Sequence, residues 1–166
     1  MKEDIKDIFQ NINEWLKFAE AKHAGLIVLN SGIIFGILSV YKDYKTIIDW
    51  HIILLIIIFI GISIILSLIS LFPITNNDTK NKNKNVPINL YFFGSLSKLN
   101  ETDFKNELLK TNANYKFDKF EKDIINQIII NSRIATRKYK LFIFAIWATT
   151  IGFILPIVNI IIKLWH

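Results

Sequence analysis

Residues 117–155 read FDKFEKDIINQIIINSRIATRKYKLFIFAIWATTIGFIL, and the fold follows from this stretch. It contains no proline and its first glycine is Gly152, so nothing in its composition ends a helix before that point. At about 1.5 Å per residue, such a helix would be roughly 55–60 Å long, about twice the hydrocarbon thickness of a bilayer. Because its first half is polar and its second half is apolar, we expect one continuous helix that begins in water and ends in lipid.

The composition is typical of a small membrane protein. Of the 166 residues, 52% are hydrophobic, and the formal net charge is +6. There is no cysteine, which excludes disulfides and thiolate metal sites. We therefore expect one compact, all-α membrane protein.

Three apolar runs are long enough to span a membrane. They predict transmembrane helices at residues 24–41, 51–72 and 141–165. Pro156 is expected to kink or break the last of these near its far end. The polar, low-complexity tract at residues 74–86 cannot bury a core and is expected to be a linker.

The remaining residues should form a part of the protein that faces water. Residues 1–23 predict an amphipathic helix, and residues 73–140 an insert between the second and third spans that includes the long helix from about residue 117. Asn100 with Asp103 indicates a helix start within the insert. The apolar stripe of the first segment consists of Ile5, Ile8, Ile12, Trp15 and Ala19. This stripe packs either on the aqueous half of the long helix or on lipid, and the acidic residues around it favour the helix.

Basic residues are distributed unevenly about the spans. Only Lys42, Lys45 and Lys163 lie outside the segments before the first span and between the second and third. The positive-inside rule therefore predicts a cytoplasmic N-terminus and insert, with the C-terminus on the opposite side.

All three spans carry small residues at helix-pairing spacing. The pairs are Gly32 with Gly36, Ser63 with Ser67, and Ala148 with Gly152. Such faces let helices approach closely, either within one chain or between copies. Polar residues also lie inside the spans, namely Asn30, Ser31, Thr149, Thr150 and Asn159. They must meet protein or water, through hydrogen bonds between helices or as the lining of a pore in an oligomer.

The aqueous half of the long helix carries a heptad-like stripe. Its members are Phe117, Phe120, Ile124, Ile128, Asn131, Ala135 and Tyr139, with Gln127 beside them. The two amides either set helix register or hydrogen-bond a base or sugar. Basic residues follow where the helix enters lipid, namely Arg133, Arg137, Lys138 and Lys140. They contact lipid headgroups or bind a phosphate.

We expect no enzyme, because no catalytic pattern is present. His23, His51 and His166 are far apart and form no metal-binding pair, and no phosphate-binding glycine loop or nucleophile elbow occurs. No catalytic residue, metal or cofactor is predicted.

Three segments carry a resemblance to a known family. They are WLKFAEAK at 15–22 running on to Asn30, NLYFFGSLSKL at 89–99, and DIINQIIINSRIA at 123–135 continued to Lys138 and Tyr139. Together they resemble the transmembrane effectors of Pycsar anti-phage defence, with the same order of two spans, cytosolic insert and final span. The chain departs from that pattern at Glu20, His23 and Ser95, where Asp, a small or amide residue, and Asp or His are usual.

The resemblance implies an effector in the bacterial inner membrane, activated by a cyclic pyrimidine mononucleotide, cUMP or cCMP, that a partner nucleotide cyclase makes. Activation would impair the membrane and cause abortive infection. We expect a homo-oligomer and no nucleic-acid partner. Expected ligand contacts are Lys98, Arg133 and Arg137 for charge, Gln127 and Asn131 for polar edges, and Tyr91 or Phe93 for stacking. The alternatives are a constitutive pore-forming or holin-like toxin and a passive membrane anchor for a partner protein.

Overall fold

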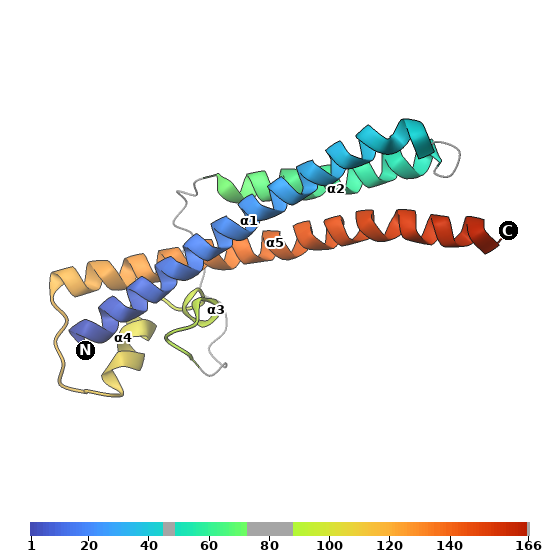
Figure 1. Ribbon diagram of the computed structural model, residues 1–166. Helices are drawn as coiled ribbons and strands as arrows, with labels where there is room; N and C mark the ends of the chain where they lie inside the picture. The colour runs from blue at the N-terminus through green and yellow to red at the C-terminus, as the bar shows by residue number, and fades with distance from the viewer. Residues whose placement is uncertain (45–48, 73–87, 166) are drawn as a thin grey trace. The chain divides into compact units, whose positions relative to one another are not determined.

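The computed structural model describes residues 1–44, 49–72 and 88–165, and every regular element in that part is a helix. The helices are α1 (Lys2–Tyr44), α2 (Trp50–Leu71), α3 (Phe93–Leu96), α4 (Glu101–Leu109) and α5 (Lys119–Trp165) (Figure 1). Of these, α1, α2 and α5 are long and apolar enough to cross a membrane. The predicted all-α membrane fold is therefore confirmed, while the linker expected at residues 74–86 lies outside the described residues.

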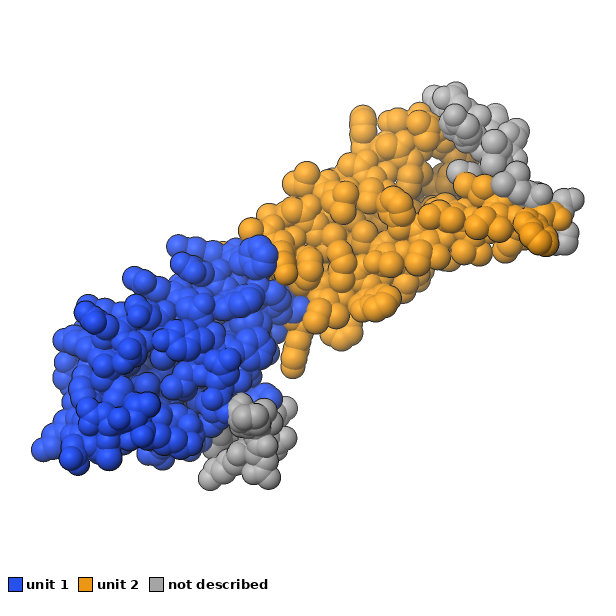
Figure 2. Space-filling view, turned by 60° about the horizontal axis from the view of Figure 1, so that its bottom comes forward, with its two compact units in different colours: residues 1–19, 73–139 blue, residues 20–72, 140–166 orange. Residues whose placement is uncertain are grey.

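Contacts divide the chain into two compact units, coloured separately in Figure 2. Unit 1 comprises Met1–Ala19 and Pro73–Tyr139, and unit 2 comprises Glu20–Phe72 and Lys140–His166. Both α1 and α5 have residues in each unit and are uninterrupted helices. The amphipathic segment predicted at 1–23 and the span predicted at 24–41 are thus parts of one helix.

Unit 1 has an apolar core built from both ends of the sequence. The apolar stripe of α1 packs with α5, α3 and α4, which is the first of the two alternatives for that stripe. The most buried members are Ile5, Ile8, Ile12, Leu96, Phe104, Ile125, Ile128 and Ala135. The stripe predicted on the long helix is wrong at Phe120, which is 59% exposed, whereas Ile125 and Ile129 are buried.

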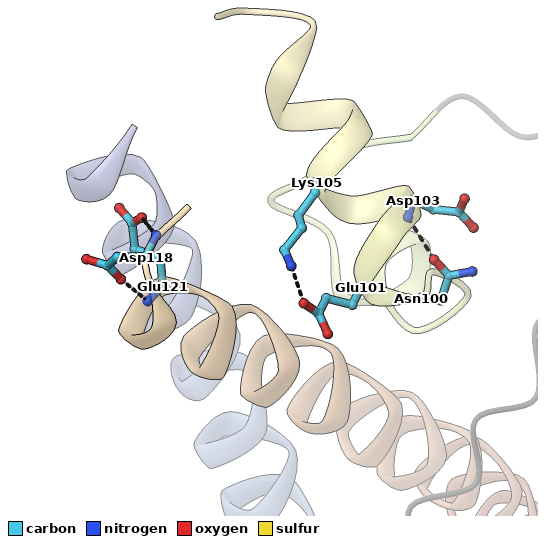
Figure 3. A network of polar contacts seen from close by, with 6 residues as sticks. All are labelled: Asn100, Glu101, Asp103, Lys105, Asp118 and Glu121. Atoms are coloured by element: carbon cyan, nitrogen blue, oxygen red, sulfur yellow. Dashed lines mark hydrogen bonds and ion pairs between the residues drawn. The ribbon is translucent and has the colours of Figure 1, made fainter. Parts of the chain in front are cut away.

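Side chains fix where α4 and α5 begin (Figure 3). The side chain of Asn100 accepts a hydrogen bond from the Asp103 backbone N–H at 2.7 Å, as its N-cap position predicts. At α5, Asp118 Oδ1 accepts from the Glu121 N–H at 2.7 Å, and Glu121 Oε2 accepts from the Asp118 N–H at 2.9 Å. This reciprocal capping box starts α5 at Lys119 and buries Glu121, which explains why Phe120 beside it faces outward.

Unit 2 consists of three apolar helical segments. The buried face of α2 recurs every three or four residues and consists of Ile53, Ile56, Ile60, Ser63, Ser67 and Ser70. A Cβ at Gly152 of α5 would lie 3.2 Å from Ile60 Cγ1 and 3.4 Å from Phe59 Cβ, so the absence of a side chain lets α5 approach α2 closely. Pro156 does not break the helix, since α5 continues to Trp165.

Candidate functional site

An aromatic cluster lies in unit 1, where α1 and α5 meet the start of α3. The Trp15 ring is 5.4 Å from the Phe93 ring, and Phe93 stacks on Tyr139 at 4.8 Å with an interplanar angle of 16°. Phe92 lies 4.8 Å from Phe93. Ring contacts therefore join helices that are distant in sequence. Each aromatic pair stabilises the fold by more than the burial of its apolar surface alone would.

A surface hollow of about 270 Å³ lies beside this cluster. Asn11, Glu14, Trp15 and Phe18 line it from successive turns of one face of α1. Asn11 Nδ2 donates to the Tyr91 carbonyl at 2.7 Å, so the hollow adjoins the Tyr91–Phe93 segment. The Phe18 side chain is 52% exposed, which gives the hollow an accessible aromatic face.

Gly94 shapes the backbone next to the cluster. A Cβ at this position would lie 2.5 Å from Cε1 of the Phe92 ring, a distance that real contacts do not show. The glycine therefore lets the Phe92 ring fold back over the start of α3. Any larger residue there would displace Phe92 and, through it, Phe93.

The two amides predicted as ligand contacts hydrogen-bond one another. Gln127 Nε2 donates to Asn131 Oδ1 at 2.9 Å, and Asn131 Nδ2 donates to Asn13 Oδ1 on α1 at 2.7 Å. The chain of three amides joins α1 to α5 within unit 1. Asn131 is the buried member of this chain, and a polar link of this kind between two helices favours the first of the two alternatives for these residues, the setting of helix register.

Arg133 holds the connection between α3 and α4. Its Nη2 donates to the Leu99 carbonyl at 2.9 Å and its Nε to the Ser97 carbonyl at 3.3 Å. Lys98, between those carbonyls, is exposed, and so is Arg137, one turn further along α5. Arg133 contacts the α3–α4 connection, which contains Lys98, whereas Asn131 hydrogen-bonds α1, so the structure does not gather the predicted contacts into one site.

The two predicted stacking residues differ in accessibility. Phe93 is 8% exposed and belongs to the core, so its ring already has Trp15 and Tyr139 as neighbours. Tyr91 is 52% exposed. Only Tyr91 of the pair presents a ring to solvent.

Electrostatics in unit 1 are local. Lys105 hydrogen-bonds Glu101 one turn away on α4, and this interaction lowers the pKa of the Glu101 carboxyl (Figure 3). Tyr115 donates to Glu121, and that bond raises the pKa of Tyr115 to about 12. Among the described residues, no group of three His, Asp or Glu side chains could hold a metal ion.

Unit 2 contains a polar cluster between its three helices. Asn30 Nδ2 of α1 donates to Ser63 Oγ of α2 at 2.8 Å, and Thr149 Oγ1 of α5 lies 2.8 Å from Ser63 Oγ and 3.1 Å from Asn30 Oδ1. Ser67, one turn from Ser63, is fully buried. These contacts are the interhelical alternative expected for polar residues in the spans.

The remaining small and polar residues of the spans divide into packed and open positions. Ala148 is buried on the same face of α5 as Gly152. Ser31 is exposed, and nothing lies within 4 Å of a Cβ built at Gly32 or Gly36. Asn159 Oδ1 is buried without a hydrogen-bond partner in the described chain.

Sequence reasoning missed the hollow on α1. Asn11, Glu14, Trp15 and Phe18 follow the i, i+3, i+4, i+7 spacing of one helical face, so the signal was present in the sequence. The apolar stripe accounts for Trp15 but does not include Phe18, whose exposure follows only from the structure.

Comparison with known proteins identifies a family. Residues 4–165 match the family model described as the Pycsar effector protein domain, PycTM. Comparisons with curated proteins and with solved structures gave no match.

Proposed function

The chain belongs to the Pycsar effector family, and on that premise we propose that a cyclic pyrimidine nucleotide, cUMP or cCMP, activates it to impair the membrane in which it resides. The observation that carries the proposal is that a chain matched over residues 4–165 consists of two units with different surfaces. Unit 1 has its own core and a hollow on its surface, and unit 2 has apolar helices of membrane-spanning length. A non-enzymatic receptor joined to a membrane effector requires these two parts.

We place the nucleotide base in the hollow lined by Asn11, Glu14, Trp15 and Phe18. Exposed aromatic faces stack on any base, and an amide can pair with the polar edge of a pyrimidine. Exposed Lys98 and Arg137 supply positive charge in the same unit for a phosphate. Gln127, Asn131 and Arg133 would then act by holding α1, α5 and the α3–α4 connection in place.

Topology and assembly follow from charge and from the open glycines. The number of lysines and arginines in the N-terminal segment and the insert favours a cytoplasmic position for unit 1, where a partner cyclase would release its product. The exposed Gly32 and Gly36 leave a face of α1 to which the same face of a second copy could pack. We therefore propose a homo-oligomer in the inner membrane.

Calorimetric titration of cUMP, cCMP and cAMP into the full chain in detergent micelles tests ligand recognition. We expect binding of at least one pyrimidine nucleotide and a loss of about tenfold or more in affinity for Phe18→Ala, since a base–aromatic stack contributes about 1–3 kcal/mol. Phe120→Ala is the matched control, because Phe120 is an exposed phenylalanine of unit 1 that does not line the hollow. Absence of binding by every cyclic nucleotide would rule out the proposed signal.

Membrane potential in cells separates the gated effector from its rivals. With a nucleotide cyclase co-expressed, we expect depolarisation only when the cyclase is active. Depolarisation without a cyclase would indicate a constitutive toxin, and no depolarisation under either condition would indicate a passive anchor.

A further inference from the structure

The buried polar residues of unit 2 are arranged along its length. On α2 the fully buried hydroxyls Ser63, Ser67 and Ser70 share one face, at steps of four and three residues. On α1, fully buried His23 and Asn30 are seven residues apart and also share a face. The His23 ring contacts the Phe142 ring of α5 edge-on at 5.5 Å. The row of buried polar residues therefore begins at His23, close in sequence to unit 1, and reaches the Asn30–Ser63–Thr149 cluster.

This row is incompletely paired within the protein. Ser67 Oγ has no hydrogen-bond partner in the described chain although it is fully buried. At the cluster, the single Thr149 hydroxyl hydrogen has three acceptors within reach: Asn30 Oδ1, Ser63 Oγ and the Ala145 carbonyl. A hydroxyl with alternative acceptors beside an unpaired hydroxyl is a position where water hydrogen-bonds readily and hydrogen bonds exchange.

The other end of unit 2 is apolar and loosely packed. A hollow of about 420 Å³ is lined by α1 beyond Asn30 (Ile33 and Ile37), by α5 beyond Thr149 (Phe153 and Ile157), and by Ile56 of α2. Because α2 passes Ser63 in the opposite direction, Ile56 lies on the same side of the cluster as these residues. The hollow therefore lies beyond the Asn30–Ser63–Thr149 cluster and is open on one side, since Phe153 and Ile157 are 53% and 51% exposed. No polar side chain lines it in the described chain.

One buried polar group lies alongside the far part of the hollow. Asn159 Oδ1 is buried and unpaired in the described residues, and Asn159 is adjacent in sequence to Ile160, which lines the hollow. Along its length, unit 2 thus passes from a row of buried polar side chains to an apolar stretch beyond Asn30 and Thr149. An apolar constriction that excludes water at rest and admits it on widening is a known way to gate a pore.

We infer that the three-helix core of unit 2 is a gated path for protons: hydroxyls and amides relay protons through its inner half, and the apolar hollow closes it until activation. This inference rests on the proposed function and adds the species that crosses and the route it takes. The route lies inside each chain and not between copies. The cluster carries no charged side chain, and a relay of hydroxyls and waters moves protons without needing the width that a hydrated ion requires.

Proton flux into liposomes of phosphatidylethanolamine and phosphatidylglycerol tests the route. The full chain is reconstituted with an enclosed pH-sensitive dye, valinomycin and potassium hold the membrane potential at zero, and 3′,5′-cUMP or 3′,5′-cCMP is added. Thr149→Val keeps the side-chain shape but removes the hydroxyl, so we expect the triggered flux to fall by about tenfold or more. Thr150→Val is the matched control, since the Thr150 hydroxyl is exposed and donates within its own helix to the Ile146 carbonyl, and its flux should remain at the wild-type level.

A second substitution tests the apolar half without a ligand. Ile37→Asn places an amide in the hollow and should give proton flux with no nucleotide, while Leu38→Asn, on the exposed face of the same helix, should not. The double variant Ile37→Asn, Thr149→Val should be silent. The comparison of Ile37→Asn with Leu38→Asn does not depend on Thr149→Val being stable.

The outcomes separate the route from the proposed function. Wild-type flux in a folded Thr149→Val protein, or equal leakage of Ile37→Asn and Leu38→Asn, overturns the route. Failure of the wild type to respond to either nucleotide overturns the proposed signal, while the two Asn variants still decide the route. Release of a large enclosed dye in parallel with the protons overturns the assignment to protons and indicates a wider pore.

Discussion

Arg133 illustrates how a basic residue near the membrane-entering part of a helix can be used inside the protein. Its guanidinium donates to the carbonyls of Ser97 and Leu99, which follow the short helix α3. A four-residue helix has little stability of its own, so α3 depends on its buried Phe93 and Leu96 and on this arginine. Arg133 thereby couples α5 to the segment that carries the aromatic cluster.

Arg133→Ala should destabilise unit 1 by about 1–3 kcal/mol, because hydrogen bonds from a charged donor are lost and two carbonyls are left without it. Arg133→Lys should restore only part of that loss, since an ammonium cannot reproduce the fork of the guanidinium. The measurements are thermal unfolding in detergent and the rate of proteolytic cleavage after Lys98. Arg137→Ala is the control and should change stability by less than about 0.5 kcal/mol. Equal effects of Arg133→Ala and Arg137→Ala would show that the Arg133 hydrogen bonds contribute nothing to the stability of unit 1.

The Tyr115 phenol should lose its proton at a higher pH than an ordinary tyrosine. Its hydrogen bond to the Glu121 carboxylate favours the protonated phenol and raises the pKa from 10.0 to about 12. Because the folded-state pKa lies above the unfolded one, this contribution to stability is complete below pH 10 and is lost as pH rises toward 12. Tyrosinate absorbance of the wild type minus Tyr115→Phe isolates this titration. A difference curve centred on pH 10, or one unmoved by Glu121→Gln, would contradict the assignment.

The apolar spans could be predicted at the level of elements, and several side-chain partners could not. Runs such as residues 51–72 need only length and hydropathy, and the Asn100 cap needs only local spacing. The partners of Arg133 are backbone carbonyls 34 and 36 residues away, which leave no side-chain pattern in the sequence. Phe120 was placed on the buried stripe because periodicity alone does not register that the capping box buries Glu121 instead.

The packing of α5 on α2 depends on the lack of a side chain at Gly152. Gly152→Leu would drive atoms into Ile60 and Phe59 and should destabilise unit 2 by about 1–3 kcal/mol. Gly32→Leu meets open space and should leave the stability of the single chain within about 0.5 kcal/mol. Unfolding in mixed detergent micelles measures both. Comparable losses of stability in the two variants would show that Gly152 is no more important than Gly32 for helix packing.

Gly32→Leu also tests assembly. If copies associate through the open face of α1, this variant should shift the mass measured by light scattering in detergent toward the monomer. Gly61→Leu is the comparison, because nothing lies within 4 Å of a Cβ at Gly61 on α2 either. An unchanged mass for Gly32→Leu would remove this face as the contact.

At the scale of the whole molecule, two helices connect a unit with a water-compatible surface to a unit suited to lipid. The boundary falls between Ala19 and Glu20 on α1 and between Tyr139 and Lys140 on α5, and neither helix is interrupted there. Each unit has buried residues of its own. A nucleotide bound in unit 1 changes the state of unit 2 only if it binds two conformations with different affinity and the connecting helices transmit the difference.

Inserting two glycines between Tyr139 and Lys140 should separate recognition from effect. Each glycine costs a helix about 1 kcal/mol, and the insertion turns the following residues of α5 by roughly 200°. We expect unchanged nucleotide affinity and unchanged membrane insertion, but loss of nucleotide-triggered proton flux in liposomes. The same insertion within residues 75–85 is the control, because that polar tract has no apolar stripe to put out of phase, and its flux should match the wild type. Full flux from the insertion after Tyr139 would mean that α5 does not carry the signal, and the matching insertion between Ala19 and Glu20 would then show whether α1 does.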